Sequence, residues 1–289
     1  MGCNLVKWNQ KRLGKKYNRK GLLEQVFKND EHTVNFWEGG DGDTVLIIHG
    51  FGADGQMTWN KTIQDLVKDY HIIVPDLLWF GKSFSTAKPN LDSQVYAMLD
   101  LLSNRKVDHC KLVGVSYGGF VSLGITQKAP ELVSKMCIVD SPGMTYNVDL
   151  LDSLCVKVGV NEVQDIFVVK NPSEVKRLFN LASVKNRRIP KGILNDTYAL
   201  YFDQHHEQLY QLLETLPSEQ KRFLQNPDIK FPPTTIIWGS DDQIFPLSEG
   251  EKLAKALDAE LKVVPKAGHA PNLDNFKQFQ KYLREFLSD

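Results

Sequence analysis

The apolar residues of this chain follow two alternating periods. Short, continuous apolar runs predict strands that are buried on both faces: residues 45–48, 72–74, 112–115 and 136–139. Between these runs, apolar residues recur at helical spacing, in residues 57–69, 93–105 and 117–128. A further strand is predicted at 34–37. Regular alternation of strands and helices favours an α/β fold with a mostly parallel, doubly wound sheet and helices on both faces.

This alternation stops after residue 143 and resumes near residue 235. The later part predicts two strands and two helices: 235–238, 261–264, 247–257 and 275–287. The intervening residues have helical character and no clear strand, which indicates an insertion into the sheet domain. The predicted organisation is therefore a basic N-terminal arm, a split core and a helical cap: 1–32, then 33–143 with 225–289, and 144–224.

The bulk composition is that of a water-soluble globular protein. The 289 residues are 42% hydrophobic and 24% charged, and 35 Lys and Arg balance 35 Asp and Glu. This balance argues against a nucleic-acid partner. No stretch reaches the roughly 18 consecutive apolar residues of a membrane span. The four cysteines form no C-x-x-C pair, which favours a reduced, cytoplasmic protein without a disulfide framework.

The first 20 residues carry seven basic side chains and no acidic one: Lys7, Lys11, Arg12, Lys15, Lys16, Arg19 and Lys20. They lack the apolar core of a signal peptide. The start Met1-Gly2-Cys3 hints at acylation, but Val6 stands where the myristoylation pattern needs Ser or Thr. We expect a solvated basic arm. Weak, peripheral contact of this arm with a membrane surface is the alternative.

The most informative stretch is Gly114-Val115-Ser116-Tyr117-Gly118, which joins a predicted strand to a predicted helix. A nucleophile on such a sharp turn stands clear of the sheet edge. Gly114 and Gly118 leave room for the turn, and the Tyr117 N–H at the helix start can donate to a developing oxyanion. Ser116 is therefore the candidate nucleophile, although the pentapeptide alone also fits a capping serine.

Three other loops follow predicted strands. In His49-Gly50-Phe51-Gly52, Gly50 allows the loop to place the Phe51 N–H opposite that of Tyr117, and His49 is expected to be a packed imidazole. The loop at 238–242 carries Asp241 and Asp242, and the loop at 267–271 carries His269. In chain order, serine, acid and histidine could form a catalytic triad in which the acid orients the imidazole.

Together these motifs make the sequence resemble a serine hydrolase of the α/β-hydrolase fold, over residues 33–142 and 225–288. The resemblance implies an inserted helical cap, with Ser116 as nucleophile and His269 as base. The family's acid closes a W-G-x-x-D pattern, which implies Asp242. Asp241 is a close rival, and Asp140, after an earlier core strand, is a weaker one.

The loop at 76–83 departs from the family pattern. The family often has D-x-P-G-x-G-x-S, but Leu78 and Trp79 stand where Pro and Gly are usual. We expect a bulkier and more apolar loop near the pocket.

The resemblance lies in the capped branch that contains monoacylglycerol lipases, esterases and carbon–carbon bond hydrolases. It implies hydrolysis of a small to medium, mostly apolar carboxylic ester through an acyl-enzyme, without metal or organic cofactor. The alternatives are a carbon–carbon bond hydrolase of meta-cleavage products and a hydrolase-fold ligand receptor. Val115 and Ala270 stand where carbon–carbon hydrolases commonly have Asn and Trp, which disfavours the first.

Two groups in the expected cap are ambiguous. Four residues that are close in sequence could suggest a metal site: Asp203, His205, His206 and Glu207. Adjacent side chains on a helix point in different directions, however, so a solvated helix is favoured. Five aromatic residues could line an acyl pocket, although we expect most to pack the cap and one or two to face substrate: Phe167, Phe179, Tyr198, Tyr201 and Phe202.

Overall fold

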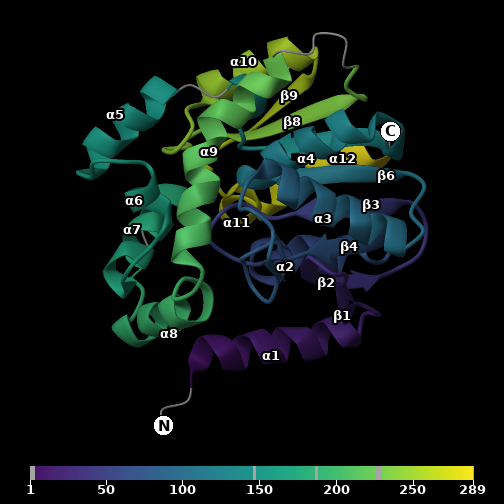
Figure 1. Ribbon diagram of the computed structural model, residues 1–289, viewed down its shortest axis with the longest axis horizontal. Helices are drawn as coiled ribbons and strands as arrows, with labels where there is room; N and C mark the ends of the chain where they lie inside the picture. Colours follow the sequence, from purple (N-terminus) through teal and green to yellow (C-terminus); the bar gives the residue numbers. More distant parts are fainter. Residues whose placement is uncertain (1–3, 146–147, 186–187, 225–229, 289) are drawn as a thin grey trace.

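The computed structural model describes residues 4–145, 148–185, 188–224 and 230–288. Its centre is one mixed sheet with the strand order β1-β2-β4-β3-β6-β7-β8-β9, and β5 pairs with β2 (Figure 1). The strands from β4 to β9 along this order run parallel, whereas β1 and β2 are antiparallel to their neighbours. The strand bounds are Leu23–Lys28 (β1), His32–Gly39 (β2), Thr44–Ile48 (β3), His71–Pro75 (β4), Phe84–Ser85 (β5), Cys110–Val115 (β6), Val133–Val139 (β7), Thr234–Gly239 (β8) and Glu260–Val264 (β9).

Helices cover both faces of the sheet, because successive residues of each strand point to opposite sides. In β3, Leu46 and Ile48 join the apolar layer under one set of helices, while Val45 and Ile47 join the layer on the other side. The first face is covered by α3 (Leu91–Asn104), α4 (Tyr117–Lys128) and α10 (Leu247–Leu257). The second is covered by α2 (Gly55–Leu66) and α12 (Phe276–Ser288). A short helix, α11 (Pro271–Asp274), precedes α12.

Between β7 and β8 the chain leaves the sheet and forms the inserted helices α5 (Val148–Val158), α6 (Gln164–Phe167), α7 (Pro172–Ala182), α8 (Lys191–Tyr201) and α9 (His206–Leu224). They lie beside one end of the sheet, and α9 returns along it toward α10 (Figure 1). The described residues of this insertion contain no strand. Across the described residues of the whole chain, no helix is both long and apolar enough to cross a bilayer.

Residues 4–32 differ from the solvated arm expected from the sequence. They contain α1 (Leu5–Asn18) and β1, whose register with β2 runs from Leu23 opposite Glu38 to Lys28 opposite Thr33. Tyr17 is fully buried, and its hydroxyl donates to the Gln56 carbonyl at 3.3 Å. The sheet therefore begins at Leu23, eleven residues before the first predicted strand, because β1 is an edge strand in which only Phe27 is buried and the apolar pattern is weak.

Candidate active site

Ser116 stands at the sharp turn between β6 and α4. Its backbone angles are φ 53° and ψ −121°, a conformation that is strained for any residue other than glycine. The flanking glycines make the turn sterically feasible. A Cβ on Gly114 would lie 2.4 Å from the Gly118 carbonyl oxygen, and a Cβ on Gly118 would lie 2.6 Å from that of His49. The turn therefore presents the Ser116 hydroxyl at the carboxyl end of the sheet.

His269 and Asp242 come from the loops after β9 and β8 and meet Ser116 there. The Nε2 atom of His269 lies 2.9 Å from Ser116 Oγ, and its Nδ1 lies 2.8 Å from Asp242 Oδ2. The Asp242 carboxylate also accepts the Ile244 N–H at 2.8 Å. Since a carboxylate can only accept, Nδ1–H donates to it, and Nε2 is left as the acceptor for the serine hydroxyl. This tautomer can take a proton from Ser116.

The two rival acids are placed differently. Asp241 is exposed and accepts a hydrogen bond from the Ser240 hydroxyl at 2.7 Å. Asp140 is fully buried, and its Oδ1 accepts the Gly239 N–H at 2.8 Å. Burial, followed by the negative charge of Asp242, raises the pKa of Asp140 well above its usual range. Asp242 is thus the carboxylate that the structure brings to His269.

The loop after β3 approaches the serine closely. A Cβ on Gly50 would lie 3.0 Å from Ser116 Cβ, so only glycine fits there without a shift. Within the described chain, the Phe51 and Tyr117 N–H groups donate no hydrogen bond to another backbone group. Neither group is used by the backbone, so both stay candidates for the oxyanion hole predicted from the sequence.

His49 has the structural role expected from the sequence. Its Nε2 accepts the Leu77 N–H at 2.9 Å, and Nδ1–H donates to the Gly50 carbonyl at 2.6 Å. Complete burial lowers its pKa to about 4, so the imidazole is neutral. It ties the loop that carries Phe51 to the loop after β4.

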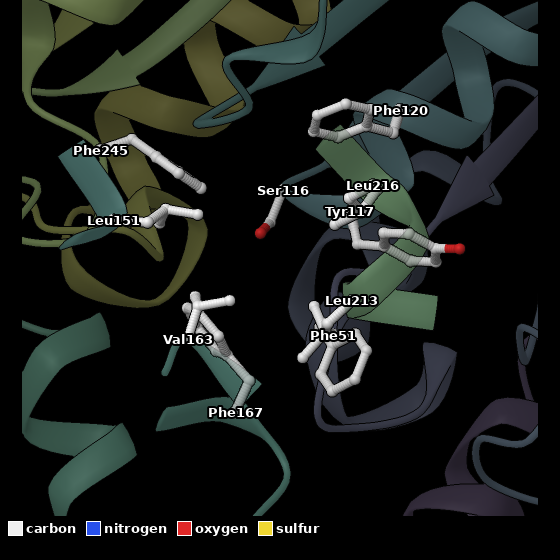
Figure 2. A pocket seen from close by; sticks show the side chains of 10 residues that line it. All are labelled: Phe51, Ser116, Tyr117, Phe120, Leu151, Val163, Phe167, Leu213, Leu216 and Phe245. Atoms are coloured by element: carbon white, nitrogen blue, oxygen red, sulfur yellow. The ribbon is translucent and has the colours of Figure 1, made fainter. Parts of the chain in front are cut away.

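The Ser116 hydroxyl opens into a pocket that is partly open to solvent (Figure 2). Core and inserted helices contribute almost entirely apolar side chains to its lining: Phe51, Tyr117, Phe120, Leu151, Val163, Phe167, Leu213, Leu216 and Phe245. The Tyr117 hydroxyl points away from Ser116 (Figure 2). Except for Phe51, Tyr117 and Phe167, none of these was singled out from the sequence, because apolar residues outside a motif carry no signal that separates a pocket wall from a core.

Of the five aromatic residues considered as pocket candidates, Phe167 lines the pocket. The other four do not line it and pack in an apolar cluster of α7 and α8, which Phe167 also contacts: Phe179, Tyr198, Tyr201 and Phe202. In the loop at 76–83, Leu78, Trp79 and Phe80 are buried. Phe80 contacts Phe51 edge to face at 4.9 Å between ring centroids, so the loop forms a second apolar layer behind the pocket wall.

The cluster at 203–207 is not arranged as a metal site. A ring nitrogen of His206 hydrogen-bonds the Phe202 carbonyl, and His205 lies against Phe84, with 5.6 Å between ring centroids. In the part of the chain that is described, no group of three or more His, Cys, Asp or Glu side chains could hold a metal ion.

Comparisons with known proteins identify similar sequences and folds. A family described as "alpha/beta hydrolase fold" matches residues 43–276. The chain is 27% identical to monoacylglycerol lipase ABHD6 of Homo sapiens over 261 residues, covering 86% of this chain and 76% of that protein. It is 26% identical to a 2-hydroxy-6-oxo-6-(2'-aminophenyl)hexa-2,4-dienoic acid hydrolase of Metapseudomonas resinovorans over 266 residues, covering 88% and 87%.

Among solved structures, a membrane phospholipase A superposes with a TM-score of 0.79 at 24% identity, over 98% of this chain and 89% of that one. At this identity the likeness concerns the fold alone. The family match spans most of the chain and includes Ser116 and His269. The chain therefore belongs to the alpha/beta hydrolase fold family and is a hydrolase.

Proposed function

We propose that this protein is a serine hydrolase that cleaves carboxylic esters of small to medium, mostly apolar acyl groups through an acyl-enzyme. One observation carries the proposal: the hydrogen-bonded series Asp242–His269–Ser116 ends in an apolar pocket. A nucleophile, a base and an orienting acid at these distances are the parts that acyl transfer needs.

In the proposed mechanism, Ser116 Oγ attacks the ester carbonyl carbon while His269 Nε2 takes the hydroxyl proton. Asp242 stabilises the imidazolium that forms, and the N–H groups of Phe51 and Tyr117 stabilise the oxyanion, each worth about 10²–10³-fold in rate. His269 then gives its proton to the leaving alcohol. Water, activated by the same imidazole, attacks the acyl-enzyme and releases the carboxylic acid.

The side chains that line the pocket favour an apolar acyl group. Its lining contains no charged side chain, and each buried methylene contributes about 0.8 kcal/mol to binding. The inserted helices supply Leu151, Phe167 and Leu213 to this wall, so we propose that they act as a cap that sets acyl selectivity. Similarity to a monoacylglycerol lipase makes monoacylglycerols the first natural esters to test.

The similarity to a hydrolase of a substituted hexadienoic acid supports carbon–carbon bond hydrolysis as the second candidate. Such a substrate carries a carboxylate, whose burial needs a cation or several donors. The lining offers no Lys, Arg or His side chain, so the ester is the better fit.

The test is hydrolysis of p-nitrophenyl esters from acetate to palmitate, and of monoacylglycerols, by wild type and Ser116→Ala. The matched control is Ser141→Ala, a buried serine whose hydroxyl has no hydrogen-bond partner among the described residues. We expect wild type and the control to show one acyl-length optimum and Ser116→Ala to lose at least about 10³-fold in rate. Turnover of a dienoate carbon–carbon substrate without ester turnover would overturn the proposal in favour of the second candidate.

A further inference from the structure

We infer that the outward face of α1 is a docking surface for anionic lipid bilayers. The surface is defined by Leu5, Trp8, Lys11, Arg12, Lys15, Lys16 and Arg19. It lies outside the proposed active site, and the inference does not depend on the proposed reaction.

The inward face of α1 is firmly attached to the protein. Tyr17 is buried against Trp37, edge to face with 5.0 Å between ring centroids, and Gln10 donates to Asp54 Oδ2 at 3.0 Å. At the other end of the helix, the Leu5 N–H donates to Asp196 Oδ2 of α8 at 2.7 Å. The helix is therefore held at both ends, and its orientation is fixed relative to the sheet and the inserted helices.

This attachment leaves two large apolar side chains in water. Leu5 and Trp8 are each 55% exposed. At 100° per residue, Trp8, Arg12, Lys15 and Arg19 form the centre of the outward face, directly opposite Tyr17. Tryptophan favours the boundary between headgroups and acyl chains, where its ring is apolar and its N–H remains hydrated.

The basic side chains of the same face are not used in ion pairs. Within the described residues, no basic side chain of α1 takes part in an ion pair. The guanidinium of Arg12 instead lies over the Trp8 ring at 5.6 Å from its centroid. Since the whole chain has equal numbers of acidic and basic residues, this concentration is local. A basic face with an exposed tryptophan and leucine is typical of helices that lie in the interface of anionic membranes.

The position of α1 gives the docking a consequence for the whole molecule. The helix lies at the lower edge in Figure 1, with α8 beside its N-terminal end. Binding through its outward face holds the inserted helices next to the bilayer. Nucleic acid would also match the charge, but exposed Leu5 and Trp8 favour lipid.

The test is co-sedimentation of the full chain with vesicles of phosphatidylcholine alone, and of phosphatidylcholine with about 30% phosphatidylserine. We expect binding only to the second, with release at about 1 M salt, where screening is strong. Arg12→Glu/Lys16→Glu should weaken binding at least about tenfold, and Trp8→Ser at least about threefold.

The control is Lys255→Glu/Lys277→Glu, which reverses two exposed lysines on α10 and α12 and should bind as wild type does. Circular dichroism of each variant verifies that the fold is retained. Equal binding to both vesicles, no binding to either, or equal losses in the control would overturn the inference. Binding to a DNA duplex without vesicle binding would assign the face to nucleic acid instead.

Discussion

At the scale of single residues, the catalytic role of His269 depends on which aspartate contacts it. Three aspartates lie on loops at the same sheet edge, yet only Asp242 reaches His269 in the described structure. The sequence narrowed the choice through the W-G-x-x-D pattern. It could not separate Asp241 from Asp242 by chemistry, because neighbouring loop residues differ only in the direction of their side chains, which the backbone of the turn sets.

This assignment predicts that Asp242→Asn lowers kcat/KM for a p-nitrophenyl ester by about 10³–10⁴-fold. An amide can donate as well as accept, so it no longer enforces the tautomer that leaves Nε2 free, and it does not stabilise the imidazolium. Asp241→Asn is the matched control and should stay within about twofold, because Asp241 contacts Ser240 at the surface. The reverse ranking would transfer the role to Asp241.

At the scale of elements, the pocket depends on how the inserted helices pack. Phe167 ends α6, lines the pocket and lies near Phe51, with 6.3 Å between ring centroids. Phe179 of α7 shares the apolar cluster of α7 and α8 with Phe167 but does not line the pocket. Both are aromatic residues of the same insertion, and no sequence pattern distinguishes them. Their difference arises from tertiary packing, which places one helix over Ser116 and the next one away from it.

The position of Phe167 in the pocket wall predicts that Phe167→Ala enlarges the pocket and shifts the acyl-length optimum to longer p-nitrophenyl esters. The kcat/KM for short esters should fall severalfold. Phe179→Ala removes the same ring at a position that does not line the pocket, so it should leave the optimum unchanged although it lowers stability. The measurement is kcat/KM across the ester series for both variants. An unchanged optimum in Phe167→Ala would mean that acyl chains do not reach α6.

The elements of the core were predicted well, and those at the N-terminus were not. The strands and helices around Ser116 have strong periodicity because both sides of a central parallel strand are buried. In α1, only Val6, Gln10, Leu13, Gly14 and Tyr17 turn inward, and several are polar or small. The surrounding lysines hide their apolar pattern. Tyr17 is buried by partners in α2 and β2, and contacts between distant segments cannot be predicted from the local sequence.

At the scale of the whole molecule, parallel strands explain why residues far apart in the chain meet. Ser116 follows β6, Asp242 follows β8 and His269 follows β9, and the carboxyl ends of parallel strands lie at one edge of the sheet. The order of the strands could not be read from the sequence, because the apolar runs are alike. The sequence did predict that the three loops follow parallel strands, and therefore that they meet at the carboxyl-terminal edge of the sheet.

A second convergence at this edge of the structure concerns two buried carboxyl groups, Asp54 and Asp76. Asp54 caps α2 by accepting the Met57 N–H at 2.6 Å, and Asp76 accepts the Gly55 N–H at 3.0 Å. Burial is the main cause that raises their pKa values, to about 6 for Asp54 and about 8 for Asp76; Asp54 further raises the pKa of Asp76. Lys82 and Glu24 are the other charged groups that act on Asp54.

Because these carboxyl groups hold their protons more tightly when folded, the folded state binds more protons than the unfolded one above about pH 4. Their contribution to stability is therefore complete below pH 4 and is lost as the pH rises through about 6 and 8. Asp54→Asn keeps the helix cap and removes one charge, so it should reduce the fall in unfolding free energy between about pH 5 and pH 9 by about 1–3 kcal/mol. Urea titrations at both pH values measure this, with the exposed Asp41→Asn as control. If wild type and both variants show the same fall in unfolding free energy between these pH values, the buried pair of Asp54 and Asp76 does not cause that fall.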